Sequence, residues 1–291
     1  VPIFFVIAGC IDKLFCDKKF DLKKRTYALL VPYVIFSIFN FVSKVAVYGL
    51  MHRLSAPMIK NELVELFITG NGTVWFLLTL WIMTLLAQYG LKRLPHDWMI
   101  LLIGILILLV NYSAQLPRHP LLVVCIRPFV ALGYWAIGYV ICSFLDQFSA
   151  NVFWSIAFIG LGGLMVWISD VRVDFFGGNF YGLTSIVASL SSSLGYVLLF
   201  CWMSRRHCFQ LLQRFLSYFG RNSLIVMLIH PIWLQCFMYP LGRGFGALTG
   251  MASLGMAILV LIVIVILEVP SIRIMNRYLG VLIGKKKTYE E

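Results

Sequence analysis

The residues best suited to chemistry lie in an apolar stretch towards the C-terminal end of the chain. His230 stands directly before Pro231, in a run that begins at Ser223. An imidazole can exchange a proton near neutral pH, and an ionisable residue at membrane depth marks a candidate functional site. Proline removes a backbone hydrogen bond and disfavours helical geometry in the residue before it. The pair predicts either a cavity-lining histidine with a functional role or a neutral histidine that hydrogen-bonds a neighbouring helix.

A second ionisable residue, Arg127, also precedes a proline inside an apolar run. A guanidinium can bind an anionic or sugar group in a cavity. It can equally extend along its flexible stem to the outer surface of the membrane. Lys44 lies near the end of another apolar run, and we expect its ammonium group to reach the surface in that second way.

Two further clusters could bind a ligand. Lys23, Lys24 and Arg25 form a basic run whose side chains suit phosphate groups, although such a run is also an ordinary topology signal. The segment Phe176–Gly182 combines glycine with aromatic residues. It could present aromatic faces to a sugar, or it could simply be a turn.

The elements that must position these residues are membrane-spanning helices. The chain is 61% hydrophobic and only 12% charged, whereas a soluble domain is about a quarter charged. Long apolar runs without alternation exclude a transmembrane barrel, so we predict an all-α polytopic bundle forming one domain over residues 1–291. The predicted segments, about nine in number, are 1–11, 26–50, 73–91, 98–114, 121–145, 152–169, 183–203, 223–238 and 251–269.

The remaining segments are connectors. Residues 51–72 form a predicted polar loop, and residues 204–222 form a basic amphipathic connector. The first apolar segment, Val1–Ile11, is too short to span and follows no initiator methionine. We therefore expect the chain to begin inside a helix and the full-length protein to have about ten spans. A small-residue face around Ser191–Ser193 and Gly195 predicts close helix packing.

The distribution of charge sets the predicted orientation. Of the 24 lysine and arginine residues, 17 fall on one side when alternate loops are grouped. Because positive charge marks cytoplasmic loops, this side and the C-terminus are predicted to be cytoplasmic. The same asymmetry accounts for most of the net charge of +12, so no nucleic-acid partner is required. The seven cysteines have no zinc spacing and none falls in an outer loop, which predicts no metal site and no disulfide framework.

Five stretches, read in order, form a joint pattern. They are Pro2–Gly9, Lys23–Tyr33, Gly72–Leu77, Pro128–Tyr139 and Asn222–Pro231. Together they resemble acyltransferase family 3, the bacterial integral membrane O-acyltransferases, and within it the fucose 4-O-acetylase-like branch. The resemblance covers the whole chain except the first helix of the family.

The resemblance implies transfer of an acetyl or other short acyl group from cytoplasmic acyl-CoA to a hydroxyl of a cell-surface or lipid-linked carbohydrate, at the bacterial cytoplasmic membrane. It implies binding of the CoA end by Lys23, Lys24, Arg25 and Arg221, and an acceptor site near Trp75, Arg127, Asn179 and Tyr181. The principal base of the family is a histidine on the first helix, so His230 takes a supporting role. Ala28 and Ala8 replace an arginine and a serine that the family usually has.

Two other classes of function remain open at this point. A transporter or flippase for a lipid-linked saccharide would share the bundle and its intramembrane ionisable residues, although no internal repeat is evident. A membrane scaffold without catalysis is the second alternative. The acceptor, the acyl group and the oligomeric state are not determined by the sequence.

Overall fold

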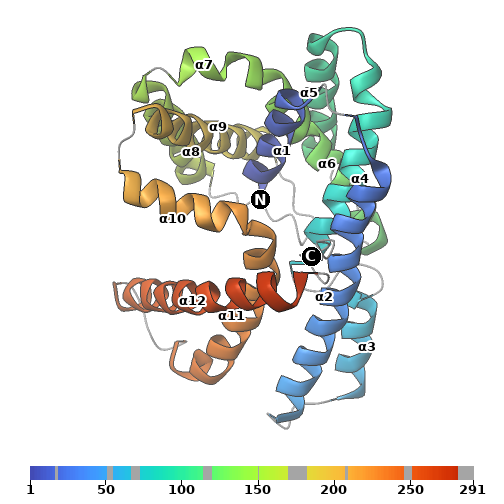
Figure 1. Cartoon of the computed structure of the whole chain (residues 1–291), viewed down its shortest axis with the longest axis vertical. Coiled ribbons are helices and arrows are strands. Elements are labelled where there is room, and N and C mark those ends of the chain that lie inside the picture. The colour runs from blue at the N-terminus through green and yellow to red at the C-terminus, as the bar shows by residue number, and fades with distance from the viewer. Residues whose placement is uncertain are drawn as a thin grey trace, which may run out of the picture. The chain divides into compact units, whose positions relative to one another are not determined.

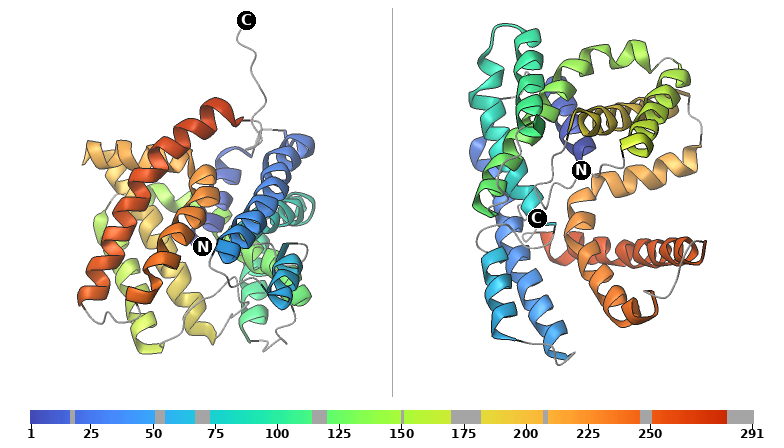
Figure 2. Two further views of the ribbon diagram at one scale, coloured as in Figure 1. Left: turned by 90° about the horizontal axis from the view of Figure 1, so that it is seen from below. Right: turned by 180° about the vertical axis from the view of Figure 1, so that it is seen from behind.

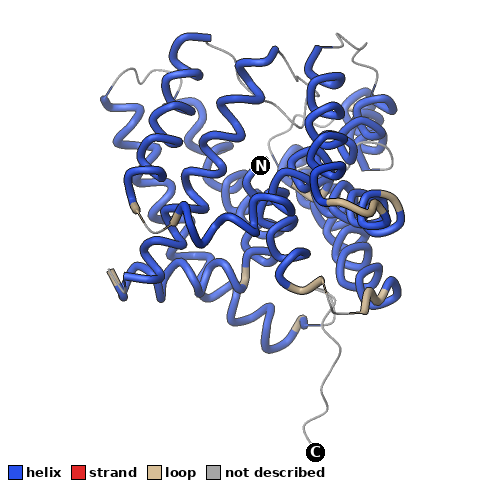
Figure 3. The backbone as a smooth tube through the Cα atoms, turned by 90° about the horizontal axis from the view of Figure 1, so that it is seen from above, coloured by secondary structure: helices blue, strands red, loops and turns tan. Residues whose placement is uncertain are grey.

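The computed structural model describes residues 1–16, 19–50, 55–66, 73–113, 120–149, 151–169, 182–206, 209–245 and 251–280. Every regular element in these ranges is helical (Figure 3), which confirms the predicted all-α class. Four helices are long and apolar enough to cross a membrane: Leu22–Leu50, Leu121–Phe144, Gly182–Arg206 and Gly255–Tyr278. Three shorter apolar helices are Asp97–Asn111, Val152–Ile168 and Ser223–Leu234. This is the composition of a multi-pass membrane protein.

The chain divides into two compact units, each built from two stretches of sequence. The first contains Val1–Leu22 and Thr79–Gln213, and the second contains Lys23–Leu78 and Arg214–Glu291. The elements of the first unit are α1 (Pro2–Leu14), η2 (Leu91–Arg93), α5 (Asp97–Ser113), α6 (Pro120–Ile141), η3 (Cys142–Phe144), α7 (Leu145–Phe148), α8 (Val152–Ser169) and α9 (Gly182–Arg206). Those of the second are α2 (Leu22–Leu50), α3 (Ala56–Val64), α11 (Ser223–Phe245) and α12 (Met251–Tyr278). Three helices, labelled in Figure 1, contribute residues to both units: α2 through Leu22 alone, α4 (Trp75–Tyr89) and α10 (Gln210–Arg221).

In the first unit, α1 and α6 approach so closely that glycine is required on both. A Cβ atom on Gly9 would collide with the carbonyl oxygen of Trp135, and one on Gly138 would collide with the carbonyl oxygen of Val6. Both obstacles are backbone atoms, which cannot rotate away. The thiol of Cys10 also donates to the Gly138 carbonyl at 3.2 Å. Small residues allow such close approach in membrane helices, and they fix α1 against the centre of α6.

The pairing of α8 with α9 uses small residues in the same way (Figure 1). A Cβ atom on Gly162 would collide with the Ser192 hydroxyl, and one on Gly195 would lie 2.8 Å from the backbone nitrogen of Ile159. The small-residue face predicted for α9 is therefore confirmed as a packing surface. Its serines satisfy themselves locally, since the Ser193 hydroxyl donates to the Ser189 carbonyl at 2.6 Å.

In the second unit, α11 and α12 form a hairpin of packed helices (Figure 2). The Asn276 amide donates to Asn222 Oδ1 at 2.8 Å, near the start of one helix and the end of the other. Further along, the Trp233 indole donates to the Ser271 hydroxyl at 3.3 Å. Polar bonds between helices fix their register in a medium that offers no competing water.

One connector and the end of the last helix differ from the sequence-based expectation. The segment predicted as a polar loop contains α3, which begins after Ser55 with Pro57 in its first turn, a position where proline suits a helix because the first amide has no helical partner. The last helix, expected to end near residue 269, continues through Pro270 to Tyr278. Membrane helices tolerate internal proline because neighbouring groups satisfy the freed carbonyl.

Candidate functional site

The side chain of His230 has a defined protonation pattern. Its Nδ1 lies 2.9 Å from the carbonyl oxygen of Val226, one turn earlier on α11. A carbonyl oxygen can only accept, so in the neutral ring Nδ1 carries the hydrogen and Nε2 keeps its lone pair. The side chain is half-buried. With Nδ1 bonded to the backbone, Nε2 is the ring nitrogen that can accept a hydrogen bond.

Pro231 leaves the carbonyl oxygen of Met227 without its usual partner on α11. In a regular helix this carbonyl would accept from the amide of residue 231, which proline lacks. The hydroxyl of Thr73 donates to this oxygen at 2.7 Å, within the second unit. The helix consequently runs on from Ser223 to Phe245 without a break. A distant threonine thus compensates the proline that follows His230.

This hydrogen bond also places the start of α4 beside α11. Thr73 stands two residues before Trp75, which begins α4 and is only 7% exposed. The Trp75 ring meets Phe76 edge to face at 6.2 Å between centroids. Trp75 is therefore packed among other side chains, and it contributes to the wall of this region rather than offering an open stacking platform.

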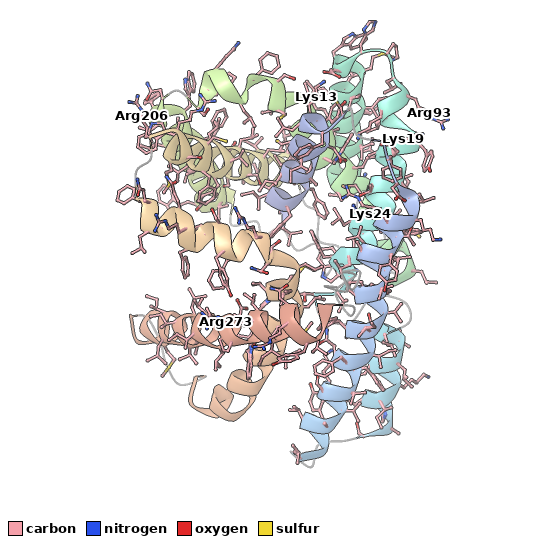
Figure 4. All side chains as sticks on the ribbon, in the orientation of Figure 1. Lys13, Lys19, Lys24, Arg93, Arg206 and Arg273 are labelled. Atoms are coloured by element: carbon pink, nitrogen blue, oxygen red, sulfur yellow. The ribbon has the colours of Figure 1, made fainter. Side chains whose placement is uncertain are left out.

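The predicted phosphate-binding residues lie at helix ends. Lys23, Lys24 and Arg25 occupy the first turn of α2 and are exposed, as the labelled Lys24 shows (Figure 4). Amide groups at a helix N-terminus and three positive side chains together favour an anion. Arg221 is exposed at the last position of α10.

Two arginines beside Arg221 were not anticipated. The bond between Asn222 and Asn276 joins the residue after Arg221 to the residue before Arg277. Arg273 lies one turn earlier on α12, and both arginines of this helix are exposed. Sequence reasoning placed them in a tail because Pro270 was taken as the end of the helix. Their helical spacing of four residues is the signal that would have paired them.

Arg127 is packed inside the first unit. It is 2% exposed, on a turn of α6 that is otherwise apolar. Its side chain therefore does not extend to the surface of this unit, and the alternative in which it binds an anionic or sugar group in a cavity stays a prediction. Two turns further along α6, the Tyr134 hydroxyl lies 2.6 Å from the Ser189 hydroxyl of α9. Arg127 belongs to a different unit from His230.

Lys44 also departs from the expected surface position. Its ammonium group lies 2.8 Å from a Glu62 carboxylate oxygen and 3.1 Å from one of Glu65. The side chains of Lys44 and Glu62 are 15% and 11% exposed. A buried charge is tolerated when it is paired, so α3 supplies the counter-charges that allow a lysine near the end of α2.

A charged and aromatic cluster ties the end of α1 to α5 and α6. Lys13 pairs with Asp97 at 2.5 Å and lies over the Tyr139 ring at 4.8 Å from its centroid. Asp12 accepts from the Trp135 indole at 3.0 Å. The hydrogen bond to Asp97 raises the pKa of Lys13 above its usual value. The Lys92 ammonium lies 3.9 Å from Asp12. Two lysines thus balance two aspartates, so the role of the cluster is to hold the first unit together.

The other two predicted acceptor-site residues, Asn179 and Tyr181, lie outside the described residues. Among the residues that the structure does describe, no group of three or more His, Cys, Asp or Glu side chains could hold a metal ion. His230 bonds to the Val226 carbonyl, and Thr73 donates to the neighbouring Met227 carbonyl.

Comparison with known proteins gives one result. The model of acyltransferase family 3, an acyltransferase domain, matches residues 1–269. No curated protein and no solved structure matches the chain. The match extends from the first residue almost to the end of α12, and it includes the whole of the region around His230 and Thr73. The chain therefore belongs to acyltransferase family 3.

Proposed function

We propose that this protein transfers an acetyl or other short acyl group from acyl-CoA to a hydroxyl of a cell-surface or lipid-linked carbohydrate. Membership of acyltransferase family 3 supports acyl transfer. The stretches that resemble the fucose 4-O-acetylase-like branch support a carbohydrate acceptor. The observation that carries the proposal is the hydrogen bond between His230 Nδ1 and the Val226 carbonyl, because it leaves Nε2 to accept a bond from the principal base that takes the proton of the hydroxyl.

In the proposed reaction the acceptor oxygen attacks the thioester carbonyl as its proton leaves. The tetrahedral intermediate then collapses, the C–S bond breaks, and the CoA thiolate takes up a proton. His230 acts in a supporting role: Nε2 accepts a hydrogen bond and so orients the principal base, which the resemblance places on the first helix of the family.

The two substrates are proposed to approach from opposite sides of the bacterial cytoplasmic membrane. Lys23, Lys24 and Arg25, together with Arg221, bind the phosphates of acyl-CoA on the cytoplasmic side, where the C-terminus also lies. Their exposure at helix ends supports this assignment. The carbohydrate is bound from the outer side by residues that include Trp75, Arg127, Asn179 and Tyr181. The burial of Arg127 supports a specific role for this residue, since a charged side chain that faces the interior of a membrane bundle marks a functional site.

The direct test is a transfer assay with the purified full-length protein and acetyl-labelled acetyl-CoA. A mixture of lipid-linked and surface glycans from a bacterial envelope serves as the acceptor. We expect label on a glycan, removable by mild base as an ester is, with release of one free CoA thiol for each acetyl group transferred. Binding of acetyl-CoA without transfer would show that the proposed class of acceptor is wrong. If the protein neither binds acetyl-CoA nor transfers the acetyl group, the proposal is rejected and transport of a saccharide is favoured.

We expect Thr73→Val to lower the transfer rate by about tenfold, because it leaves the part-buried Met227 carbonyl without a donor at a cost of about 1–3 kcal/mol. The backbone one turn before Pro231 would then shift, and His230 with it. Thr73→Ser keeps the hydroxyl and should restore the rate. Steady-state transfer with both variants makes the comparison, and equal rates for valine and serine would contradict a positioning role.

A further inference from the structure

The short helix α10 (Gln210–Arg221) is divided lengthwise into an apolar and a polar side. At about 100° per residue, one side carries Leu211, Leu212, Phe215, Leu216, Tyr218 and Phe219. The opposite side carries Gln210, Gln213, Arg214, Ser217, Gly220 and Arg221. The separation is complete over the twelve residues of the helix. A helix with this pattern suits a position where one of its sides meets an apolar surface and the other meets a polar one.

The protein covers that side of α10 only in part and leaves Leu216, Tyr218 and Phe219 half-buried. No residue of α10 is buried, and Leu211 and Phe215 are 83% and 46% exposed. Phe209, just before the helix, is 70% exposed. Large apolar side chains gathered on one exposed side mark an interaction surface.

The position of α10 in the chain identifies the neighbouring medium. The helix follows α9, which is long and apolar enough to cross a membrane, and precedes the shorter apolar helix Ser223–Leu234 of α11. Successive spans reach the same side of a bilayer between them, so α10 begins and ends at one membrane surface. A basic amphipathic helix at such a point lies in the interface, with its apolar side among the acyl chains.

The charges around α10 are of one sign. Arg205 and Arg206 close α9, as the labelled Arg206 shows (Figure 4). Arg214 and Arg221 lie on the polar side of α10. No aspartate or glutamate occurs between Asp174 and Glu268, so this stretch carries no acidic side chain. Anionic headgroups carry the complementary charge.

We propose that α10 lies in the lipid interface and binds anionic phospholipid headgroups of the leaflet on the side of the basic loops. Leu211 and Phe215 insert among the acyl chains, and Arg214 holds a headgroup phosphate. This function is independent of acyl transfer, because it needs only the membrane and the helix described. Its readout is correspondingly separate from transfer activity.

The test measures amide hydrogen exchange of residues 209–222 in the full chain, reconstituted into phosphatidylcholine nanodiscs with increasing fractions of phosphatidylglycerol. We expect protection of these amides to rise with the phosphatidylglycerol fraction and to fall when salt is added, because surface attraction is screened. Peptides from α8 serve as an internal reference whose protection should not follow the lipid charge. Protection that is the same in both lipids would overturn the proposal.

Two variants separate charge from insertion. Arg214→Gln should require about fivefold more phosphatidylglycerol for half-maximal protection, which corresponds to the attraction of one basic residue at the surface. Phe215→Ser should lower protection in both lipids. Lys60→Gln removes one exposed positive charge from α3 and is the matched control, expected to change nothing. Protection that depends on two copies per disc would identify a second chain as the occupant and would also overturn the proposal.

Discussion

Replacing His230 by alanine is expected to lower acyl transfer about 100-fold, at the low end of what a positioned acid–base group contributes. The loss should appear in kcat, because Nε2 orients the principal base and does not contact the bound CoA phosphates. The KM for acetyl-CoA should remain unchanged. The measurement is a steady-state assay with purified protein, with the acetyl-CoA concentration varied at saturating acceptor.

The control for this substitution is His96→Ala. His96 is exposed and stacks on Trp98 with 6.3 Å between ring centroids, so the same change there should leave the rate unaltered. His230→Gln keeps a donor for the Val226 carbonyl but cannot take a proton at neutral pH. We expect it to remain defective. Wild-type activity in His230→Ala would remove His230 from the proposed mechanism.

The second large effect is structural and falls on Gly138. An alanine there would force its Cβ into the backbone of Val6, where no side chain can rotate to make room. Overpacking of a core costs about 3 kcal/mol, and more where the obstacle is backbone. We expect the thermal unfolding midpoint of the detergent-solubilised protein to fall by about 6–12 °C, with a matching loss of monodisperse protein on size-exclusion chromatography.

Gly160 of α8 provides a matched control. A Cβ atom at this position would meet nothing within 4 Å. Alanine favours a helix over glycine by about 0.5–1 kcal/mol, so Gly160→Ala should leave the midpoint unchanged or raise it slightly. If the two variants melted alike, the close approach of α1 to α6 would not be a determinant of stability.

The spanning helices could be predicted where polar residues interrupt the apolar runs. The expected span 152–169 coincides with α8, because Asn151 precedes it and its side chain accepts from the Phe153 amide at 2.9 Å. The end of α12 could not be predicted in this way. Proline stops helices in water, but in a membrane protein the helix continues through Pro270.

The candidate site around His230 could be predicted only in part, because the sequence does not show which distant segments meet. A histidine inside an apolar run stands out by composition, so His230 could be named. Thr73 could not, because nothing in a Gly-Thr-Val sequence indicates a carbonyl partner on a helix far along the chain. Lys44 was expected at the surface because its partner Glu62 stood in a segment read as a loop. A pairwise contact becomes predictable only when both elements that carry it are recognised.

The bond between Thr73 and Met227 also constrains the order of assembly. Its two residues are 154 positions apart, so during synthesis the start of α4 enters the membrane long before α11 exists. Contacts of such large sequence separation form late, because the intervening chain must be ordered first. The Met227 carbonyl therefore gains its hydrogen-bond donor only when these two segments meet. Correct geometry at His230 is accordingly a product of the final stage of folding, and variants that trap earlier intermediates would retain their helices while lacking an ordered site.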